Sequence, residues 1–433
     1  MISIVTIILF ITSVYLGRIL FQHWFNHLSL YVFVWTFMIL LFQMRLIRYQ
    51  DLNTETWIYI LIAFISYLFG ILTYFAGKGT SIKYFDNSRS DILFILDNNA
   101  KKIRLLIWIF GGIALLVTLQ NWYVLIKMFG DVNKVLINAN LIYRMRIQRT
   151  IEGQIPYFFI FGYVAVLLSA IYTVYKNKFT FTSFFPFIPI ILKEISQVGR
   201  AGIMMSFFEF LITFFLFRFF YKNRRNEKKS TKKLLLGSVI IVIVIIFSAS
   251  IVKLSRGPIE NIPGTSAELR QFQDNLFISP TMYLYFSGHV GVLNKFLEQD
   301  KEKSLIAENS LLGLYSILSK FEIVKRPTDY AKGYFIPIWI NTGTYIRELY
   351  SDYGFLGPII FPFILGLLTT ILYFRFFQFG NLATFTLLVY MYTLIGFSYF
   401  VLITRLASWY MSLVTLLILA FIIRMKLLNT YKK

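Results

Sequence analysis

Long apolar stretches divided by short polar loops run along almost the whole chain of 433 residues. A helix needs about 20 predominantly apolar residues to cross the hydrocarbon core of a bilayer. A transmembrane β-barrel would instead show alternating apolar and polar positions, so we expect an all-α fold. The continuous stretches predict eleven membrane-spanning helices, at about 1–17, 28–44, 57–76, 103–120, 156–175, 181–199, 201–220, 234–252, 353–373, 381–400 and 404–423.

Composition indicates the same class of protein. Hydrophobic residues make up 57% of the chain, with 47 Phe and 28 Tyr, and only 15% of residues are charged. A soluble protein could not cover that surface with polar groups, so the chain is expected to be an all-α polytopic membrane protein. The absence of Cys excludes disulfides and Cys-ligated metals, and three His make a His-built metal site unexpected. We expect no cofactor.

The distribution of Lys and Arg predicts the orientation of the chain. The loop 218–233 holds eight basic residues among sixteen, and cytoplasmic loops are enriched in such residues. Alternation from this loop places the N-terminus outside and the C-terminus in the cytoplasm. The chain then consists of eight spans in 1–252, a large extracytoplasmic loop at 253–351 and three spans in 352–433. The net charge of +22 lies largely in loops beside spans, so it does not indicate a nucleic-acid partner.

The extracytoplasmic loop contains one apolar and aromatic stretch, at 276–297. Gly288 and Gly291 lie within it, and the segment 287–289 is too polar to cross lipid. Non-helical backbone is tolerated at membrane depth only where protein or water covers it. We therefore expect a re-entrant or interfacial pair of short helices here.

Several arginines fall on the face predicted to lie outside, against the usual sorting of basic residues. They have two interpretations, contact with lipid headgroups and outer carboxylates, or an anion site at the membrane surface. The planar guanidinium fork favours bidentate contacts with phosphate oxygens. Two of these arginines are flanked by small residues, in the stretches GRAG and SRGP. The candidates are Arg144, Arg146, Arg149, Arg200, Arg256 and Arg347.

Candidates for a general base on the outer side are Asp352, Glu348 and His289, with Asp329 as a weaker one. The spacing of Glu348 and Asp352 is i, i+4, so a helix would place both carboxylates on one face. The alternative is that each simply pairs with a nearby arginine.

Glu209 is the acidic residue that falls deep inside a predicted span. An unpaired carboxylate in that position is costly, so it should be protonated or paired. Lys193, Arg200 and Arg405 are possible partners. Glu209 has either a structural role in such a pair or a role in a substrate pathway.

Three stretches together resemble the bacterial oligosaccharide repeat-unit polymerases of the Wzy type, which build O-antigen and capsular polysaccharide. They are GRAG at 199–202, YLYFSGHVGVLNKFL at 283–297 and NTGTYIRELYSDYGFLGPIIFPFILG at 341–366. The resemblance extends to the layout of the whole chain, and His289 departs from it, because a Pro or a small residue is expected there. The related O-antigen ligases carry a His-Asn pair before an acidic-x-Gly motif. The segment 343–351 before Asp352 has no His, which favours the polymerases.

The resemblance implies a glycosyltransferase of the bacterial plasma membrane. Its substrate would be oligosaccharide repeat units joined by pyrophosphate to a polyprenyl lipid, and a chain-length regulator and a flippase would be its partners. Arginines would bind the pyrophosphate, and Asn341 and Tyr345 belong to the motif that would contact substrate. Two alternatives stay open, a ligase-like glycan transferase and a flippase or other transporter of lipid-linked oligosaccharide. A transporter would need charged groups along a central path, and of these only Glu209 lies deep in a span.

Overall fold

The chain consists almost entirely of helices joined by turns. The computed structural model describes residues 2–78, 90–148, 150–153, 155, 157–197, 199, 201–225, 262–276, 280–299, 301–325, 327 and 331–431. Within these ranges, eight helices are long and apolar enough to cross a membrane, and the strands amount to one antiparallel pair. The expected all-α polytopic membrane fold is confirmed.

The described residues belong to two compact units. The first takes its residues from Met1–Ile82, Ile259–Tyr373 and Leu394–Trp409, and the second from Lys83–Pro258, Phe374–Thr393 and Tyr410–Lys433. Three helices have residues in both units: α17 (Gly357–Phe379), α18 (Leu382–Phe397) and α19 (Ala407–Tyr431).

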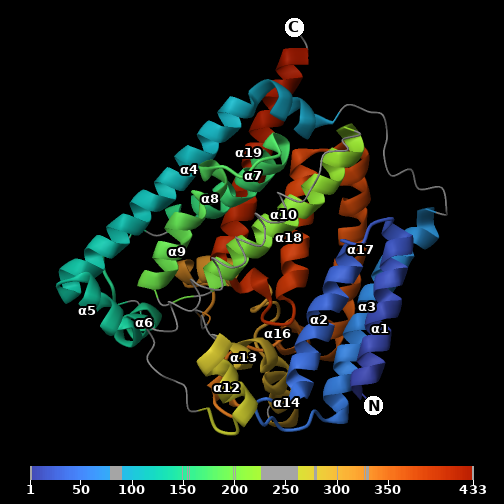
Figure 1. Cartoon of the computed structure of the whole chain (residues 1–433), viewed down its shortest axis with the longest axis vertical. Helices are drawn as coiled ribbons and strands as arrows, with labels where there is room; N and C mark the ends of the chain where they lie inside the picture. Colours follow the sequence, from blue (N-terminus) through green and yellow to red (C-terminus); the bar gives the residue numbers. More distant parts are fainter. Residues whose placement is uncertain are drawn as a thin grey trace. The chain divides into compact units, whose positions relative to one another are not determined.

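The first unit contains three long N-terminal helices and the shorter helices of the large polar loop. Tyr31 of α2 and Tyr67 of α3 stack with ring centroids 4.5 Å apart, and α1 packs along α2, as Figure 1 shows. In the same unit α13 contacts α2, while α14 contacts α3 and α16. The elements are α1 (Ile2–Phe21), α2 (His27–Met44), α3 (Thr54–Lys78), α12 (Ala267–Leu276), α13 (Pro280–Ser287), α14 (His289–Gln299), α15 (Leu312–Leu318), β1 (Tyr334–Phe335), β2 (Trp339–Ile340), α16 (Tyr345–Tyr353) and the 3-10 turn η4 (Ile403–Arg405).

The second unit is built around α7, which packs against α4 and α10. Thirteen of the 16 residues of α7 are buried, as expected for a helix covered by neighbours on several faces. The elements are α4 (Asp91–Phe129), α5 (Val132–Ile137), α6 (Ala139–Gln148), α7 (Phe161–Lys176), α8 (Phe181–Phe184), α9 (Phe187–Ser196) and α10 (Ala201–Arg225).

The helices differ from the predicted spans mainly where charge or proline interrupts an apolar stretch. The span expected at 103–120 is the middle of α4, which has 39 residues and a non-helical residue at Asn99. Hydropathy detects the part of a helix that fits in lipid, not its charged extensions. The span expected at 181–199 is two short helices, α8 and α9, with Pro186 at the start of the second. The span expected at 234–252 lies outside the described residues.

The helical pair expected at 276–297 is present as α13 and α14, divided at Gly288. Eight of the eleven residues of α14 are buried, including His289. The pair therefore contributes its side chains to the interior of the first unit.

Two glycines set the corner between α16 and α17. Gly354 ends α16 with a φ of 62°, a left-handed conformation that residues with a side chain rarely adopt. At Gly357, which begins α17, an added Cβ would lie 2.1 Å from the Leu349 carbonyl oxygen. The polar helix α16 and the apolar helix α17 therefore meet at a fixed junction, with the acidic residues of α16 beside it.

Candidate active site

A polar cavity of about 500 Å³ lies in the first unit. Its walls come from α16, from η4, from the residues that follow α14 and from the start of the hairpin β1–β2. Basic and acidic side chains dominate the lining. The lining residues are Phe296, Glu302, Lys303, Ser304, Glu308, Asn309, Ala331, Lys332, Tyr334, Arg347, Glu348, Ser351 and Arg405.

The Glu348 carboxylate and the Arg405 guanidinium form a buried ion pair at this cavity. Nη1 of Arg405 lies 3.2 Å from Oε1 of Glu348, and the two side chains are only 7% and 3% exposed. The second carboxylate oxygen accepts the backbone N–H of Leu402. Burial makes each charge depend on its partner, because removing one of the two leaves the other uncompensated.

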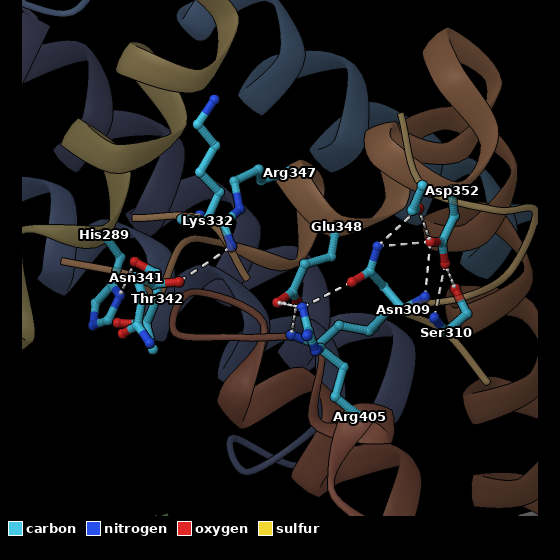
Figure 2. Close-up of polar contacts among 12 residues, drawn as sticks. His289, Asn309, Ser310, Lys332, Asn341, Thr342, Arg347, Glu348, Asp352 and Arg405 are labelled. Carbon is cyan, nitrogen blue, oxygen red and sulfur yellow. Dashed lines mark hydrogen bonds and ion pairs between the residues drawn. The ribbon is translucent and has the colours of Figure 1, made fainter. Parts of the chain in front are cut away.

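Asp352, one turn further along α16, has a different environment. Its carboxylate accepts five hydrogen bonds from the turn 304–311. Oδ1 accepts from the Ser304 hydroxyl. It also accepts from both the backbone and the side-chain amide of Asn309, and Oδ2 accepts from the backbone and the hydroxyl of Ser310 (Figure 2). Hydrogen bonds of this kind compensate the desolvation of a buried carboxylate. They make Asp352 the anchor of the turn.

Asn309 connects the two acidic residues. Its Nδ2 donates to Asp352 over 2.7 Å, and its Oδ1 accepts from Nη1 of Arg405 over 2.8 Å. Figure 2 shows the resulting sequence of contacts, from Asp352 through Asn309 and Arg405 to Glu348. The i, i+4 spacing does place both carboxylates on one side of α16, but each has its own set of donors.

Arg347 is buried and lies apart from this chain of contacts, beside Lys332 (Figure 2). Its Nη1 donates to the Lys332 carbonyl and its Nη2 to the Asn341 carbonyl, each over 3.2 Å. Both acceptors are neutral backbone atoms, so the guanidinium keeps its net positive charge at the cavity. The structure thus brings Arg347 and Arg405, with Lys332, to one cavity that also holds the Glu348 carboxylate.

The His289 ring contacts the backbone of the segment that precedes α16. Nε2 lies 2.7 Å from the Tyr285 carbonyl, and Nδ1 lies 3.2 Å from the Thr342 carbonyl. Burial lowers the pKa of His289 to about 4, and the nearby Arg347 adds to that effect while the two carbonyls oppose it. The ring does not line the polar cavity; it connects α13, through Tyr285, to the backbone of Thr342 before α16.

Two motif residues predicted to bind substrate have other surroundings. The Tyr345 side chain is fully buried, and its hydroxyl lies 2.9 Å from that of Tyr31 in the helical core. Asn341 presents its carbonyl to Arg347, and neither residue lines the polar cavity.

A second, more apolar cavity of about 650 Å³ begins where the polar one ends. Lys303, Ser304 and Ser351 line both. From these residues the second cavity follows the first turns of α17. The remaining lining residues are Ile306, Asp352, Tyr353, Gly354, Leu356, Gly357, Ile360, Phe361 and Ile364.

The arginines predicted in the second unit are described in part. Arg144 of α6 is exposed. Arg146 is half-buried, donates from Nη1 to the Gln197 carbonyl over 3.1 Å and lies over the Tyr143 ring. Arg149, Arg200 and Arg256 lie outside the described residues, as does Asp329.

Glu209 is buried in α10, and two of its three suggested partners are engaged elsewhere. Lys193 forms an ion pair with Glu194 over 2.9 Å, and Arg405 pairs with Glu348. Glu194, which the sequence did not single out, is buried and also accepts the Gly202 N–H over 3.4 Å.

The sequence also gave no sign of Asn309, Ser304 and Ser310 as site residues. Arg405 was predicted only as a possible partner of Glu209, because a single arginine between two apolar stretches is costly unless it is paired. Its pairing with Glu348 was not predicted. Among the described residues no group of three or more His, Cys, Asp or Glu could hold a metal ion. Comparisons of the chain with models of known protein families, with curated protein sequences and with solved structures find no match.

Proposed function

We propose that this protein is a polysaccharide polymerase of the bacterial plasma membrane. It would join oligosaccharide repeat units, each carried on polyprenyl pyrophosphate, at the outer face of the membrane during O-antigen or capsule assembly. The proposal starts from the resemblance of 199–202, 283–297 and 341–366 to the Wzy-type polymerases.

The observation that carries the proposal is the pair of adjoining cavities. A lipid-linked pyrophosphate has an apolar tail, an anionic centre and a polar glycan. The apolar cavity beside α17 suits the first part of the tail, and the cavity with Arg347, Arg405 and Lys332 suits the anion and the adjoining sugar. Lys303, which lines both, would lie where the pyrophosphate passes from one to the other.

The chemistry requires that one bond breaks and one forms at the anomeric carbon of the donor sugar. The bond to the pyrophosphate oxygen breaks, and its electron pair stays on the leaving pyrophosphate. A hydroxyl of the acceptor sugar forms the new glycosidic bond and releases its proton. Positioned guanidinium groups stabilise the charge that develops on the leaving group, which lowers the barrier of the chemical step.

Glu302, Glu308 and Glu348 all border the cavity that holds the basic groups. Glu348 is the one that is buried and paired with a guanidinium there, so we assign it the acceptance of that proton. A general base must come within hydrogen-bond reach of the hydroxyl it deprotonates. The approaching pyrophosphate would give Arg405 a second anionic partner and so weaken its ion pair with Glu348. Asp352, whose oxygens are occupied by five donors, would act by keeping the turn 304–311 in place.

The test uses a strain that lacks the chain and is complemented with single variants. The glycan is separated on a gel. Wild-type protein should give a ladder, whereas Glu348→Gln and Arg405→Lys should give single repeat units or a much weaker ladder. Arg405→Lys keeps the charge but loses the planar fork. Glu268→Gln, which changes an exposed carboxylate of α12, is the matched control and should give a normal ladder.

The uncomplemented strain separates the alternatives. A product of one repeat unit without a ladder supports a polymerase. Complete loss of surface glycan would instead indicate a flippase or a ligase and would overturn the proposal. A full ladder from both Glu348→Gln and Arg405→Lys would remove the cavity from the mechanism.

A further inference from the structure

The turn 304–311, between α14 and α15, has its polar and apolar sides reversed relative to a turn that faces water. Ser304, Asn309 and Ser310 direct their polar atoms inward to Asp352. Leu305 and Leu311 are exposed, and Ile306 is 76% exposed. A turn in water usually buries its apolar side chains and solvates its polar ones.

The backbone of this turn is also largely satisfied from within the protein. The N–H of Leu305 is bonded to the Glu308 carboxylate over 3.0 Å, and that of Leu311 to the Ala307 carbonyl. The Ile306 carbonyl accepts the Tyr315 hydroxyl over 2.6 Å. Internal partners are required where water is scarce, because an unsatisfied peptide group there is costly.

The exposed apolar side chains continue onto the helix that enters the membrane. Ile306 lines the apolar cavity together with Leu356, which directly precedes α17, and Ile360, in the first turn of α17. Both of these side chains are themselves exposed. Since α17 belongs to a segment apolar enough to cross a bilayer, we expect its exposed side chains to face lipid. Lys303, at the edge of the same turn, is exposed as well and could contact phosphate groups of lipids.

From these observations we propose that the turn 304–311 rests in the membrane interface. Leu305, Ile306 and Leu311 contact the upper part of the acyl chains, and the apolar cavity beside α17 opens to the bilayer instead of to water. Interfacial segments of this kind insert about 5–10 Å into the boundary between headgroups and chains. This inference depends on the membrane class of the protein and not on the reaction proposed above.

The absence of Cys makes a direct test available. A single cysteine replaces Ile306, carries the environment-sensitive fluorophore NBD, and the purified chain is placed in vesicles of phosphatidylethanolamine and phosphatidylglycerol. We expect blue-shifted emission, quenching by lipids with a nitroxide on the acyl chain, and several-fold weaker quenching by aqueous iodide than at a control position. Because the Ile306 side chain is mostly exposed, the label should disturb few contacts.

The control is Glu268→Cys, on an exposed position of α12, whose label should respond to iodide and not to the lipid nitroxides. A second label at Ile360 reports on the cavity and should also be quenched from the lipid. If the label at Ile306 responds to iodide as strongly as the control and not to lipid, the inference is wrong. A turn that is covered by a protein partner in the cell would give this contrary result as well, because the vesicles contain no such partner. None of the readings requires glycan transfer.

Discussion

Asp352 is the residue for which the structure makes the sharpest prediction. Each of its two oxygens accepts a backbone N–H, from Asn309 at Oδ1 and from Ser310 at Oδ2, at distances of 2.8 and 2.7 Å. A hydroxyl can rotate and become an acceptor, but a backbone N–H cannot. In Asp352→Asn the new NH₂ group must therefore face a backbone donor, whichever way the amide is turned.

The expected cost follows from these contacts. Losing a hydrogen bond to a buried carboxylate costs about 1.5–3 kcal/mol, and a buried donor left without an acceptor adds roughly 1–3 kcal/mol. Asp352 is 4% exposed, so water cannot compensate. We expect Asp352→Asn to reduce the free energy of unfolding by about 3–5 kcal/mol. For a chain of 433 residues this corresponds to a fall in the melting midpoint of roughly 3–6 °C.

The assay is thermal unfolding of the purified protein in detergent without substrate, so that catalysis cannot contribute. Glu308→Gln is the matched control in the same turn. Glu308 accepts the Leu305 N–H on one oxygen, and a glutamine can place its amide oxygen there, so the cost should stay below about 1 kcal/mol. The reasoning would be refuted if Asp352→Asn melted like the wild type. If its rate of glycan transfer then fell by about 10²-fold, Asp352 would be the general base instead of Glu348.

Three further predictions concern charge, pH and orientation. Arg405→Met should cost about 3–5 kcal/mol of stability because it leaves the Glu348 carboxylate without its partner in the interior. Adding Glu348→Gln should recover much of that loss in the same melting assay. Additive losses from the two substitutions would contradict the pairing. Burial lowers the pKa of His289 to about 4, against an ordinary value of about 6.5. The neutral ring therefore contributes stability that is fully present above about 6.5 and is lost, by up to about 3 kcal/mol, as the pH falls from there through 4. His289→Gln should flatten that dependence between pH 7 and 5, and an unchanged slope would assign it to other groups. A cysteine at Glu268 should react with an impermeant thiol reagent in intact cells while one at Ser230 is protected, and the reverse pattern would invert the orientation.

The fold was predictable to the extent that lipid imposes it. Apolar length alone located the helices α1, α2 and α3 near their observed positions, because the bilayer sets a minimum apolar length that no packing detail alters. It failed for α8 and α9, where Pro186 divides one apolar stretch into two helices. It also missed the first three turns of α4, where Asp97, Lys101 and Lys102 separate the buried stretch 92–96 from the long apolar one.

The site was predictable only along one helix. Arg347, Glu348 and Asp352 were predicted as site residues because they lie close together in the segment 341–366, at the edge of an apolar stretch. Their partners come from elsewhere, with Arg405 57 residues from Glu348 and Asn309 43 residues from Asp352. A sequence shows which charges will be costly to bury, but which distant donors compensate them depends on how α16 packs in the first unit.

This arrangement also explains why the two acidic residues of α16 need not share one role. Asp352 receives donors from neutral groups of a single turn, so its charge stabilises that turn. Glu348 is paired with the Arg405 guanidinium, so another anion that enters the cavity can take the place of Glu348 in that pair. Asn309, bonded to both Asp352 and Arg405, makes the position of that guanidinium depend on the turn. If the turn rests in the membrane interface, a lipid chain entering beside Ile306 would act on the same structural element that positions Arg405.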